Sequence, residues 1–373
     1  MNKTFRLMDL VEGARNLVLE YTCVKKGENI CIYADTNCDA LVIEAIACAA
    51  KEAGAEVVVI VSSELDDPGD TGLIDPPKIA RNAFYASDVV ISIVSVFKMQ
   101  FSTKSVAKAL KEHGVRFAYV GPNTSEELAS EWARFPADLA FAIGKRTLAD
   151  LQKGGHDITI TDENGTNLKA RVEPTDWHGA GIRGPLNKPG SYAVIPATTA
   201  GTTKIKQASG RIFVDFLEIF GPSAETCELV VEDNWITDVR GGPQATIFRD
   251  RIFSIENANL LSQIAWGFNP KGRINKCLQP PWDKNKMAMI SRFAGVMHIG
   301  VGSTAFHQGE KGQFVSAMHT HAVLLKPTVS AGNRLIIEKG RITALDDPEI
   351  RALAKKYSDP DLDLTKQERV FKN

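Results

Sequence analysis

Residues 29–61 read NICIYADTNCDALVIEAIACAAKEAGAEVVVIV, and this stretch decides the fold. Asn29 to Ala34 predicts a strand, Asp39 to Ala53 an alanine-rich helix, and Glu56 to Val61 a second strand. Both strand segments are apolar on both faces, which is typical of parallel strands covered by helices on each side. The stretch therefore predicts a β–α–β unit of a parallel sheet.

The same alternation extends over the first part of the chain. Further helices are expected at residues 7–19, 77–87, 105–113 and 128–153, and further strands at 89–94 and 116–120. The first strand-to-helix turn, Ala34 to Asp39, contains no glycine, so it lacks the GxGxxG fingerprint of a dinucleotide site. We therefore expect an α/β domain over residues 1–153 that serves as a scaffold.

The pattern changes at about residue 154. Short alternating segments follow, separated by glycine, proline and Asn-Gly, and Glu163-Asn164-Gly165-Thr166 is a strong hairpin signal. One helix is expected at about Ser254 to Ile264, a strand at Ser191 to Ile195, and a polar tail from Asp346. The predicted fold class is α/β: an N-terminal parallel-sheet layer, then a mainly antiparallel, β-rich metal domain over residues 154–373.

The overall composition excludes several classes of protein. The 373 residues have a formal net charge of −1 and 44% hydrophobic residues, so no nucleic acid or acidic membrane surface is expected as a partner. The sequence shows no signal peptide and no apolar segment of membrane-spanning length. Its six cysteines include no CxxC pair and are expected to be reduced. We predict a cytoplasmic location.

Three of the seven histidines lie near the C-terminal end. His319 and His321 are two residues apart in a segment that predicts a strand, so their imidazoles point to one face. His298 lies in Gly295 to Gly302, where Gly300 and Gly302 share its face and leave space beside it. If the two strands pair, three imidazoles converge as metal ligands would. The alternative is that they are separate, hydrogen-bonded histidines.

Other candidate residues have weaker support. His178, in a Gly/Pro-rich loop, and His307, in a polar loop, are acid–base candidates; an exposed loop is the alternative for His178. Trp266 is a candidate stacking platform for a substrate, although a core aromatic residue would give the same pattern. No GxSxG motif is present, so serine nucleophilic catalysis has little support.

A succession of motifs in the C-terminal half carries a family resemblance. These are Ile236-Thr237-Asp238-Val239-Arg240-Gly241-Gly242, Ile264-Ala265-Trp266-Gly267-Phe268-Asn269-Pro270, Met297-His298-Ile299-Gly300 and Met318-His319-Thr320-His321. In order and spacing they resemble the aminopeptidase T family of metallopeptidases, and more closely the related 2,5-dihydroxypyridine 5,6-dioxygenases. The resemblance implies a metal enzyme that forms a homo-oligomer.

The sequence departs from the peptidase pattern at the ligand positions. By the resemblance, His298 and His319 match the two family histidines, and His321 stands in place of an aspartate. Gln263 stands where a metal-binding glutamate is expected, and the other glutamate position falls near Tyr192. Neutral ligands do not offset the charge of two divalent ions, so one metal is favoured over two. Gln263, Tyr192 and Trp266 are then candidates for substrate binding.

The leading hypothesis is a mononuclear, non-haem Fe(II) dioxygenase that opens the ring of a hydroxylated, nitrogen-containing aromatic such as a dihydroxypyridine, with O₂ as co-substrate. In it His298, His319 and His321 hold the metal; Mn and Zn also suit such a set. The alternatives are a metal-dependent hydrolase of aminopeptidase or amidase type, and a non-catalytic ligand-binding descendant.

Overall fold

The computed structural model describes residues 4–65, 74–95, 99, 103–173, 177, 184–196, 199–202, 204–272, 274, 278, 289–303 and 316–357. The chain divides into two compact units. The first comprises residues 1–141 and 183–197, and the second comprises residues 142–182 and 198–373. The sequence predicted one boundary, at residue 153. In the structure the chain passes from one unit to the other three times, after residues 141, 182 and 197.

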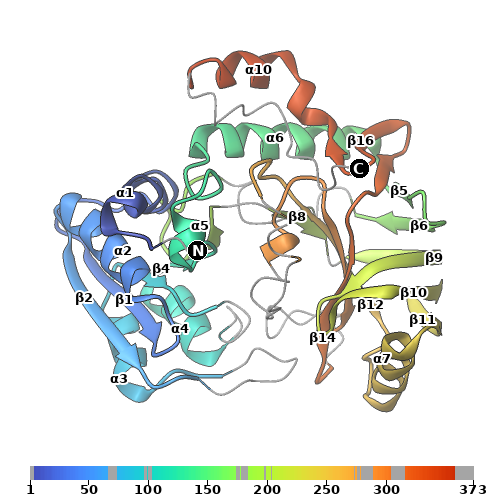
Figure 1. The fold of residues 1–373 in the computed structure, drawn as a ribbon, viewed down its shortest axis with the longest axis horizontal. Coiled ribbons are helices and arrows are strands. Elements are labelled where there is room, and N and C mark those ends of the chain that lie inside the picture. Colours follow the sequence, from blue (N-terminus) through green and yellow to red (C-terminus); the bar gives the residue numbers. More distant parts are fainter. Residues whose placement is uncertain are drawn as a thin grey trace. The chain divides into compact units, whose positions relative to one another are not determined.

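The first unit is built on a parallel sheet of five strands among the described residues, in the order β2-β1-β3-β4-β7. One face of the sheet packs on α3 and α4 through a core that includes Tyr33, Phe84 and Phe117. Figure 1 shows α1 and α2 on the other side of the sheet. The strands are β1 (Asn29–Asp35), β2 (Glu56–Ser62), β3 (Val89–Ser92), β4 (Arg116–Val120) and β7 (Tyr192–Ile195).

The helices of this half follow the predicted periodicity with two differences. The first helix ends in a π-helical segment, and the helix expected over residues 128–153 begins only at Ala137, directly after Pro136, which disfavours helical backbone in the residue before it. The elements are α1 (Leu7–Arg15), the π-helix Asn16–Tyr21, α2 (Ala40–Glu52), α3 (Lys78–Tyr85), α4 (Lys104–His113), α5 (Ser125–Leu128) and α6 (Ala137–Gly154).

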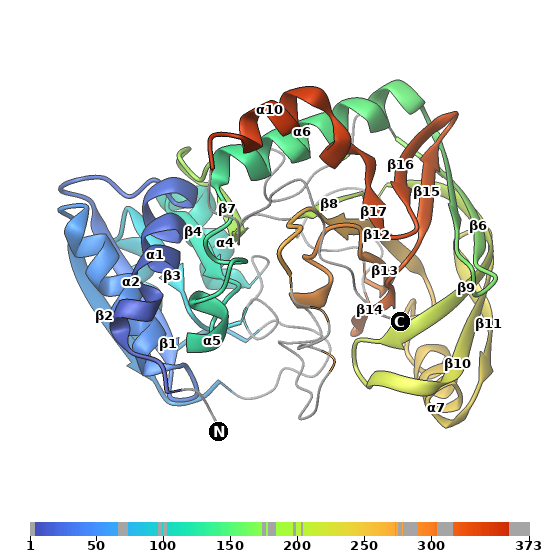
Figure 2. The same ribbon diagram turned by 45° about the horizontal axis from the view of Figure 1, so that its top comes forward.

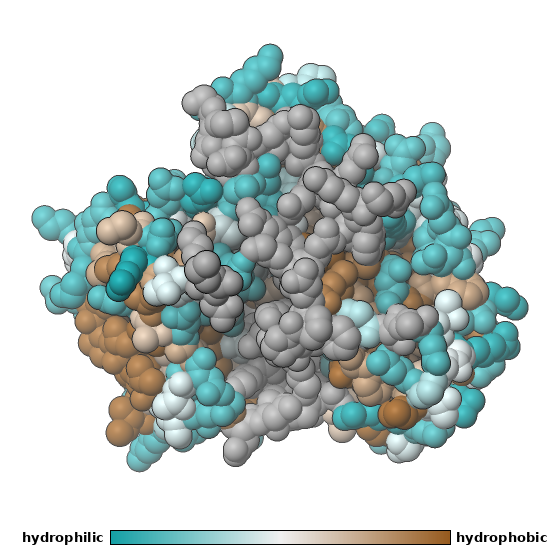
Figure 3. All heavy atoms as spheres, in the orientation of Figure 1, coloured by the Kyte–Doolittle hydropathy of each residue, from teal (hydrophilic) through white to brown (hydrophobic). Residues whose placement is uncertain are grey.

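Strand β2 is the edge of the parallel sheet and carries exposed apolar side chains. Val58 is 58% exposed, and Val59 and Val61 are also exposed. Figure 3 shows hydrophobic residues on the side of this unit where β2 and α3 lie. Among the described strands β2 pairs only with β1, so these valines have neighbours on one side only.

The second unit is built on an antiparallel sheet of twelve strands within the described ranges, in the order β17-β16-β15-β5-β6-β9-β14-β13-β12-β8, with β10 and β11 added beside β9. The parallel layer followed by an antiparallel, β-rich part confirms the predicted fold class (Figures 1 and 2). The strands are β5 (Asp157–Thr161), β6 (Asn167–Val172), β8 (Thr199–Thr202), β9 (Ile205–Leu217), β10 (Gly221–Glu232), β11 (Trp235–Gly241), β12 (Leu261–Gly267), β13 (Met297–Gly302), β14 (His319–Leu324), β15 (Thr328–Ala331), β16 (Arg334–Glu338) and β17 (Arg341–Ile342).

Two predictions for this half are wrong. The expected helix at Ser254 to Ile264 is absent: α7 (Pro243–Ser254) ends there and β12 follows. The sequence feature that marks the start of α7 is Pro243, directly after Gly242, because proline favours the first helical turn. The strand at Ser191 to Ile195 is present, but it joins the parallel sheet beside β4 rather than the antiparallel one.

The remaining described elements near the C-terminus are a 3-10 helix, Thr343–Asp346, and α10 (Pro348–Ala354). Asp347 caps α10 by accepting a hydrogen bond from the backbone N–H of Glu349. Across the described ranges, none of the helices combines the length and apolar character needed to cross a bilayer.

Candidate metal centre

Strands β13 and β14 pair in an antiparallel register that gathers the three histidines on one face. Gly302 lies opposite His319, and Gly300 lies opposite His321. His298 is two residues before Gly300, so its side chain points to the same face. The pairing expected from the sequence is therefore present. Both glycines allow close approach: a Cβ atom on Gly300 would lie 2.7 Å from the Gln263 Cβ, and one on Gly302 would overlap the Met318 carbonyl oxygen.

The ring nitrogens of His319 and His321 are fixed by the groups around them. Nδ1 of His319 lies 2.9 Å from the carbonyl oxygen of Ser303, and Nδ1 of His321 is hydrogen-bonded to the Glu218 carboxylate. A carbonyl or carboxylate oxygen only accepts, so both Nδ1 atoms donate. In the neutral rings the lone pairs are then on the Nε2 atoms, which face each other at 3.1 Å. Two lone pairs at this separation repel unless a proton or a metal ion lies between them.

His298 completes the cluster of rings. Its ring centroid lies 4.7 Å from that of His321, which in turn lies 4.9 Å from that of His319. His298 is 3% exposed, and its Nδ1 is buried with no hydrogen-bond partner in the described part of the chain. An unsatisfied buried nitrogen costs free energy unless a ligand pairs with it.

Burial keeps His298 and His319 neutral. The pKa of His298 is held well below its ordinary value, first by burial and then by the neighbouring His321 and Arg292. Burial, with a contribution from His321, lowers the pKa of His319 to about 3. Neutral imidazole is the form that binds metal ions, so the environment favours the ligating state.

Gln263 lies on the same face, across Gly300 from His321. In β12 it pairs with Gly300, and a Cβ atom built on that glycine would lie 2.7 Å from the Gln263 Cβ. Its Nε2 lies 3.3 Å from the Cβ position of Gly201 in the next strand. The two glycines therefore make room for the amide side chain beside the histidines.

A cation and an anion flank the histidine face. Arg292 donates a hydrogen bond from Nη1 to the Thr199 hydroxyl at 3.2 Å, while its Nε is buried with no partner among the described residues. Burial lowers the pKa of Arg292 to about 10, an effect opposed by Glu218, so the guanidinium stays charged at neutral pH. Glu218 is only 8% exposed.

Of the other predicted site residues, Trp266 points away from this face. Trp266 is fully buried and pairs with Met297, so it points to the opposite side of β12 from Gln263, where its ring lies 5.1 Å from that of Trp177. Tyr192 is in β7 of the first unit. His178 and His307 lie outside the described residues.

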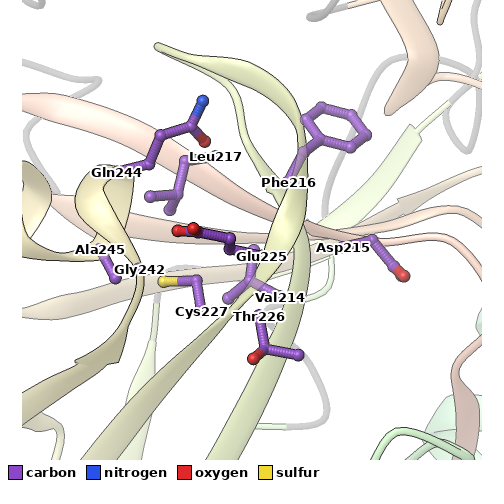
Figure 4. Close-up of a pocket in the computed structure, with 10 residues that line it drawn as sticks. All are labelled: Val214, Asp215, Phe216, Leu217, Glu225, Thr226, Cys227, Gly242, Gln244 and Ala245. Atoms are coloured by element: carbon purple, nitrogen blue, oxygen red, sulfur yellow. The ribbon is translucent and has the colours of Figure 1, made fainter.

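A small cavity lies on the β9–α7 side of the second sheet and is separate from the histidines. Its volume is about 10 Å³, roughly that of one water molecule. Figure 4 shows Glu225, Cys227 and Leu217 turned toward it and Phe216 turned away. A Cβ atom on Gly242 would overlap the Glu225 carboxylate, so this carboxylate lies at the start of α7. Carboxylates stabilise helix N-termini, which gives Glu225 beside this cavity a structural role.

Within the described ranges, no group of three or more His, Cys, Asp or Glu side chains is arranged to hold a metal ion. The facing Nε2 atoms of His319 and His321 present two donors, and the unpartnered Nδ1 of buried His298 is a third nitrogen nearby. These donors are the types that bind Fe(II), Mn(II) and Zn(II). The donor chemistry of these residues therefore suits a transition metal.

The family model described as 2,5-dihydroxypyridine 5,6-dioxygenase matches residues 11–344. This chain belongs to that family. The match spans both units and includes β13 and β14, and it confirms the resemblance seen in the sequence. No protein of curated function matches the sequence closely enough to count as a relative.

Solved structures share the fold. The 2,5-dihydroxypyridine dioxygenase from Pseudomonas putida KT2440 is 18% identical, with a TM-score of 0.69 over 93% of this chain and 100% of that one. Wild-type AmpT from Thermus thermophilus is 14% identical, with a TM-score of 0.60 over 90% of this chain and 99% of that one. At these identities the two structures establish the architecture alone.

Glu218, Ser303 and Arg292 were not found by reasoning from the sequence. Glu218 directly follows the end of β9, and its backbone N–H donates to the carbonyl of His321 at 2.9 Å. Its separation from His321 by 103 residues leaves no local spacing to reveal it. A carboxylate just after a buried strand was the one available signal.

Proposed function

We propose that this protein is a metal-dependent, ring-cleaving dioxygenase whose substrate is a hydroxylated, nitrogen-containing aromatic such as a dihydroxypyridine. His298, His319 and His321 would hold one metal ion, with Fe(II) as the leading candidate and Mn or Zn as alternatives. The observation that carries the proposal is the pair of Nε2 atoms 3.1 Å apart, with both Nδ1 atoms engaged by acceptors. Family membership supports the choice of reaction.

A bound Fe(II) would supply the redox chemistry with O₂. The protein's own residues would orient the substrate. The Arg292 guanidinium, whose buried Nε has no partner among the described residues, suits an oxyanion of the hydroxylated ring. The Gln263 amide, beside Gly300 on the histidine face, can hydrogen-bond to a ring hydroxyl or nitrogen. His178 and His307 remain acid–base candidates, and a homo-oligomer and a cytoplasmic location are further parts of the proposal.

Oxygen uptake tests this function. The protein, purified without oxygen and loaded with Fe(II), is mixed with 2,5-dihydroxypyridine in an oxygen-electrode cell. We expect one O₂ to be consumed per ring lost, since both oxygen atoms enter the opened product. The His321→Ala variant is expected to lose bound iron and activity, measured by elemental analysis and oxygen uptake.

His113→Ala is the matched control. His113 stacks on Tyr85 in the first unit, whereas the three histidines belong to the second unit. This variant should keep both iron and activity. Iron bound equally by wild type and His321→Ala would contradict the ligand assignment.

A metal-dependent hydrolase is the second candidate, favoured by the fold shared with AmpT. It would use a metal-activated water and need a free general base. Glu218, the carboxylate beside the histidines, is already engaged by His321, which weakens this candidate. Amide cleavage without oxygen uptake would favour the hydrolase, and absence of bound metal would favour a non-catalytic ligand-binding protein.

A further inference from the structure

We propose that Glu218 is a positioning residue for the metal centre: it holds His321 with Nε2 as the donor and supplies the negative charge that three histidines lack. The inference deepens the proposed function and rests on its metal site. Glu218 would act through His321 without touching the metal or the substrate.

The contacts of Glu218 attach it to His321 at two points. Its carboxylate accepts a hydrogen bond from Nδ1 of His321, and its backbone N–H donates to the His321 carbonyl. Both side chains are less than a tenth exposed. The ring therefore cannot rotate without breaking a buried, charge-assisted hydrogen bond. Its Nε2 is held toward His319.

The charge of the site gives a second reason. Neutral imidazole ligands bring no negative charge to a metal ion, and Arg292 adds one positive charge near Glu218. A divalent ion would add two more positive charges. Glu218 is the carboxylate that contacts these histidines in the described part of the chain. A carboxylate bonded to Nδ1–H makes the opposite nitrogen a stronger donor to a metal.

A purely structural role is the competing explanation. Glu218 would then only neutralise the partly buried Arg292, and its loss would lower stability without changing metal binding. The two explanations differ in the metal affinity and in the state of the His321 ring, and both quantities can be measured without enzyme turnover.

The first measurement is the affinity for Zn(II), an oxygen-insensitive probe, by titration calorimetry on the full-length protein. Glu218→Gln keeps the side-chain length and an oxygen acceptor but removes the charge. We expect its affinity to fall roughly 10- to 100-fold. Glu218→Asp, which keeps the charge, should retain more affinity than Glu218→Gln and provides a second variant should the first not fold.

Asp215→Asn is the matched control. Asp215 is a partly buried carboxylate of β9 that accepts a hydrogen bond from the backbone N–H of Leu325 and contacts none of the three histidines. Its variant should bind Zn(II) as the wild type does. Circular dichroism of each variant verifies that the protein is folded.

The second measurement is long-range ¹H–¹⁵N correlation on protein labelled at its seven histidines. In the wild type, the His321 signal should show a protonated Nδ1 before Zn(II) is added and a metal-shifted Nε2 afterwards. In Glu218→Gln the Nδ1 proton should become mixed between the two ring nitrogens.

The outcomes separate the two proposals. If the wild type binds no Zn(II), the proposed metal site is overturned, and this inference with it. If the wild type binds Zn(II) and Glu218→Gln binds equally well with the same His321 signals, the inference is overturned while the proposed function stands.

Discussion

At the scale of single residues, the histidine face depends on glycines as much as on histidines. Gly300 adopts a backbone conformation open to any residue, yet a Cβ atom there would lie 2.7 Å from the Cβ of Gln263 and 3.0 Å from the hydroxyl of Ser262. Both distances are shorter than a normal van der Waals contact. Glycine is therefore required by the close approach of β12 and not by the backbone angles.

The Gly300→Ala substitution should destabilise the protein for this reason. The added methyl group has to displace Gln263, and overpacking of this kind costs about 1–3 kcal/mol. The measurement is the midpoint of urea unfolding, compared with that of the wild type. An unchanged midpoint would show that β12 and β13 are farther apart than the structure places them.

The reactivity of each cysteine thiol depends on how deeply that residue is buried. Burial raises the pKa of Cys31 to about 12 and that of Cys227 to about 11, whereas Cys48 is exposed. Thiolate is the reactive form, so the two buried thiols stay protonated and shielded at neutral pH. We expect iodoacetamide at pH 8 to modify Cys48 first, and Cys31 and Cys227 only after unfolding, as measured by peptide mass spectrometry. Modification of Cys31 at the rate of Cys48 in the folded protein would contradict this.

At the scale of elements, Asp39 joins two helices. It caps α2 by accepting a hydrogen bond from the Leu41 N–H at 3.0 Å, and its second oxygen accepts from the backbone and hydroxyl of Ser125, at 2.7 and 2.6 Å, at the start of α5. One carboxylate thus satisfies backbone groups of both helices, which are otherwise unpaired at a helix start.

Asp39→Ala should lower the free energy of unfolding by about 2 kcal/mol, because it removes a cap and the hydrogen bonds to Ser125. Asp39→Asn keeps one acceptor oxygen for the cap but turns an N–H group toward the donors of Ser125, so its loss should be intermediate if that oxygen stays at the cap. Chemical denaturation monitored by circular dichroism measures both. Equal stability of Asp39→Ala and the wild type would show that α2 and α5 need no side-chain link.

At the scale of the whole molecule, the two units differ in what a metal ion would do to them. The three histidines are all in the second unit. A ligand that binds only the native state stabilises it by about 2.7 kcal/mol at a concentration 100 times its dissociation constant. Metal should therefore protect the second unit locally against opening.

Hydrogen exchange with mass spectrometry checks this expectation. Added Zn(II) should slow exchange in β13 and β14, whereas β1 and β3 of the parallel sheet should exchange as before. Removal of the metal with a chelator should restore the original rates. Equal protection of both sheets would place the metal elsewhere or indicate a second site.

The sequence by itself determined the features that depend on local periodicity. Apolar segments of strand length, alternating with helical ones, are enough to predict a parallel layer, since each segment has to bury its own faces. The His-x-His spacing placed His319 and His321 on one face for the same reason, and glycines beside His298 indicated space there.

Only the tertiary structure decided which distant segments meet. From the sequence, Tyr192 to Ile195 is one more strand of the β-rich half. It pairs with β4 instead, because strand pairing depends on which strand the folded chain places beside it. Glu218 reaches His321 across 103 residues for the same reason. The alternation in residues 29–61 specifies a β–α–β unit, but the neighbours of its strands and of the histidines are set by contacts that no local pattern encodes.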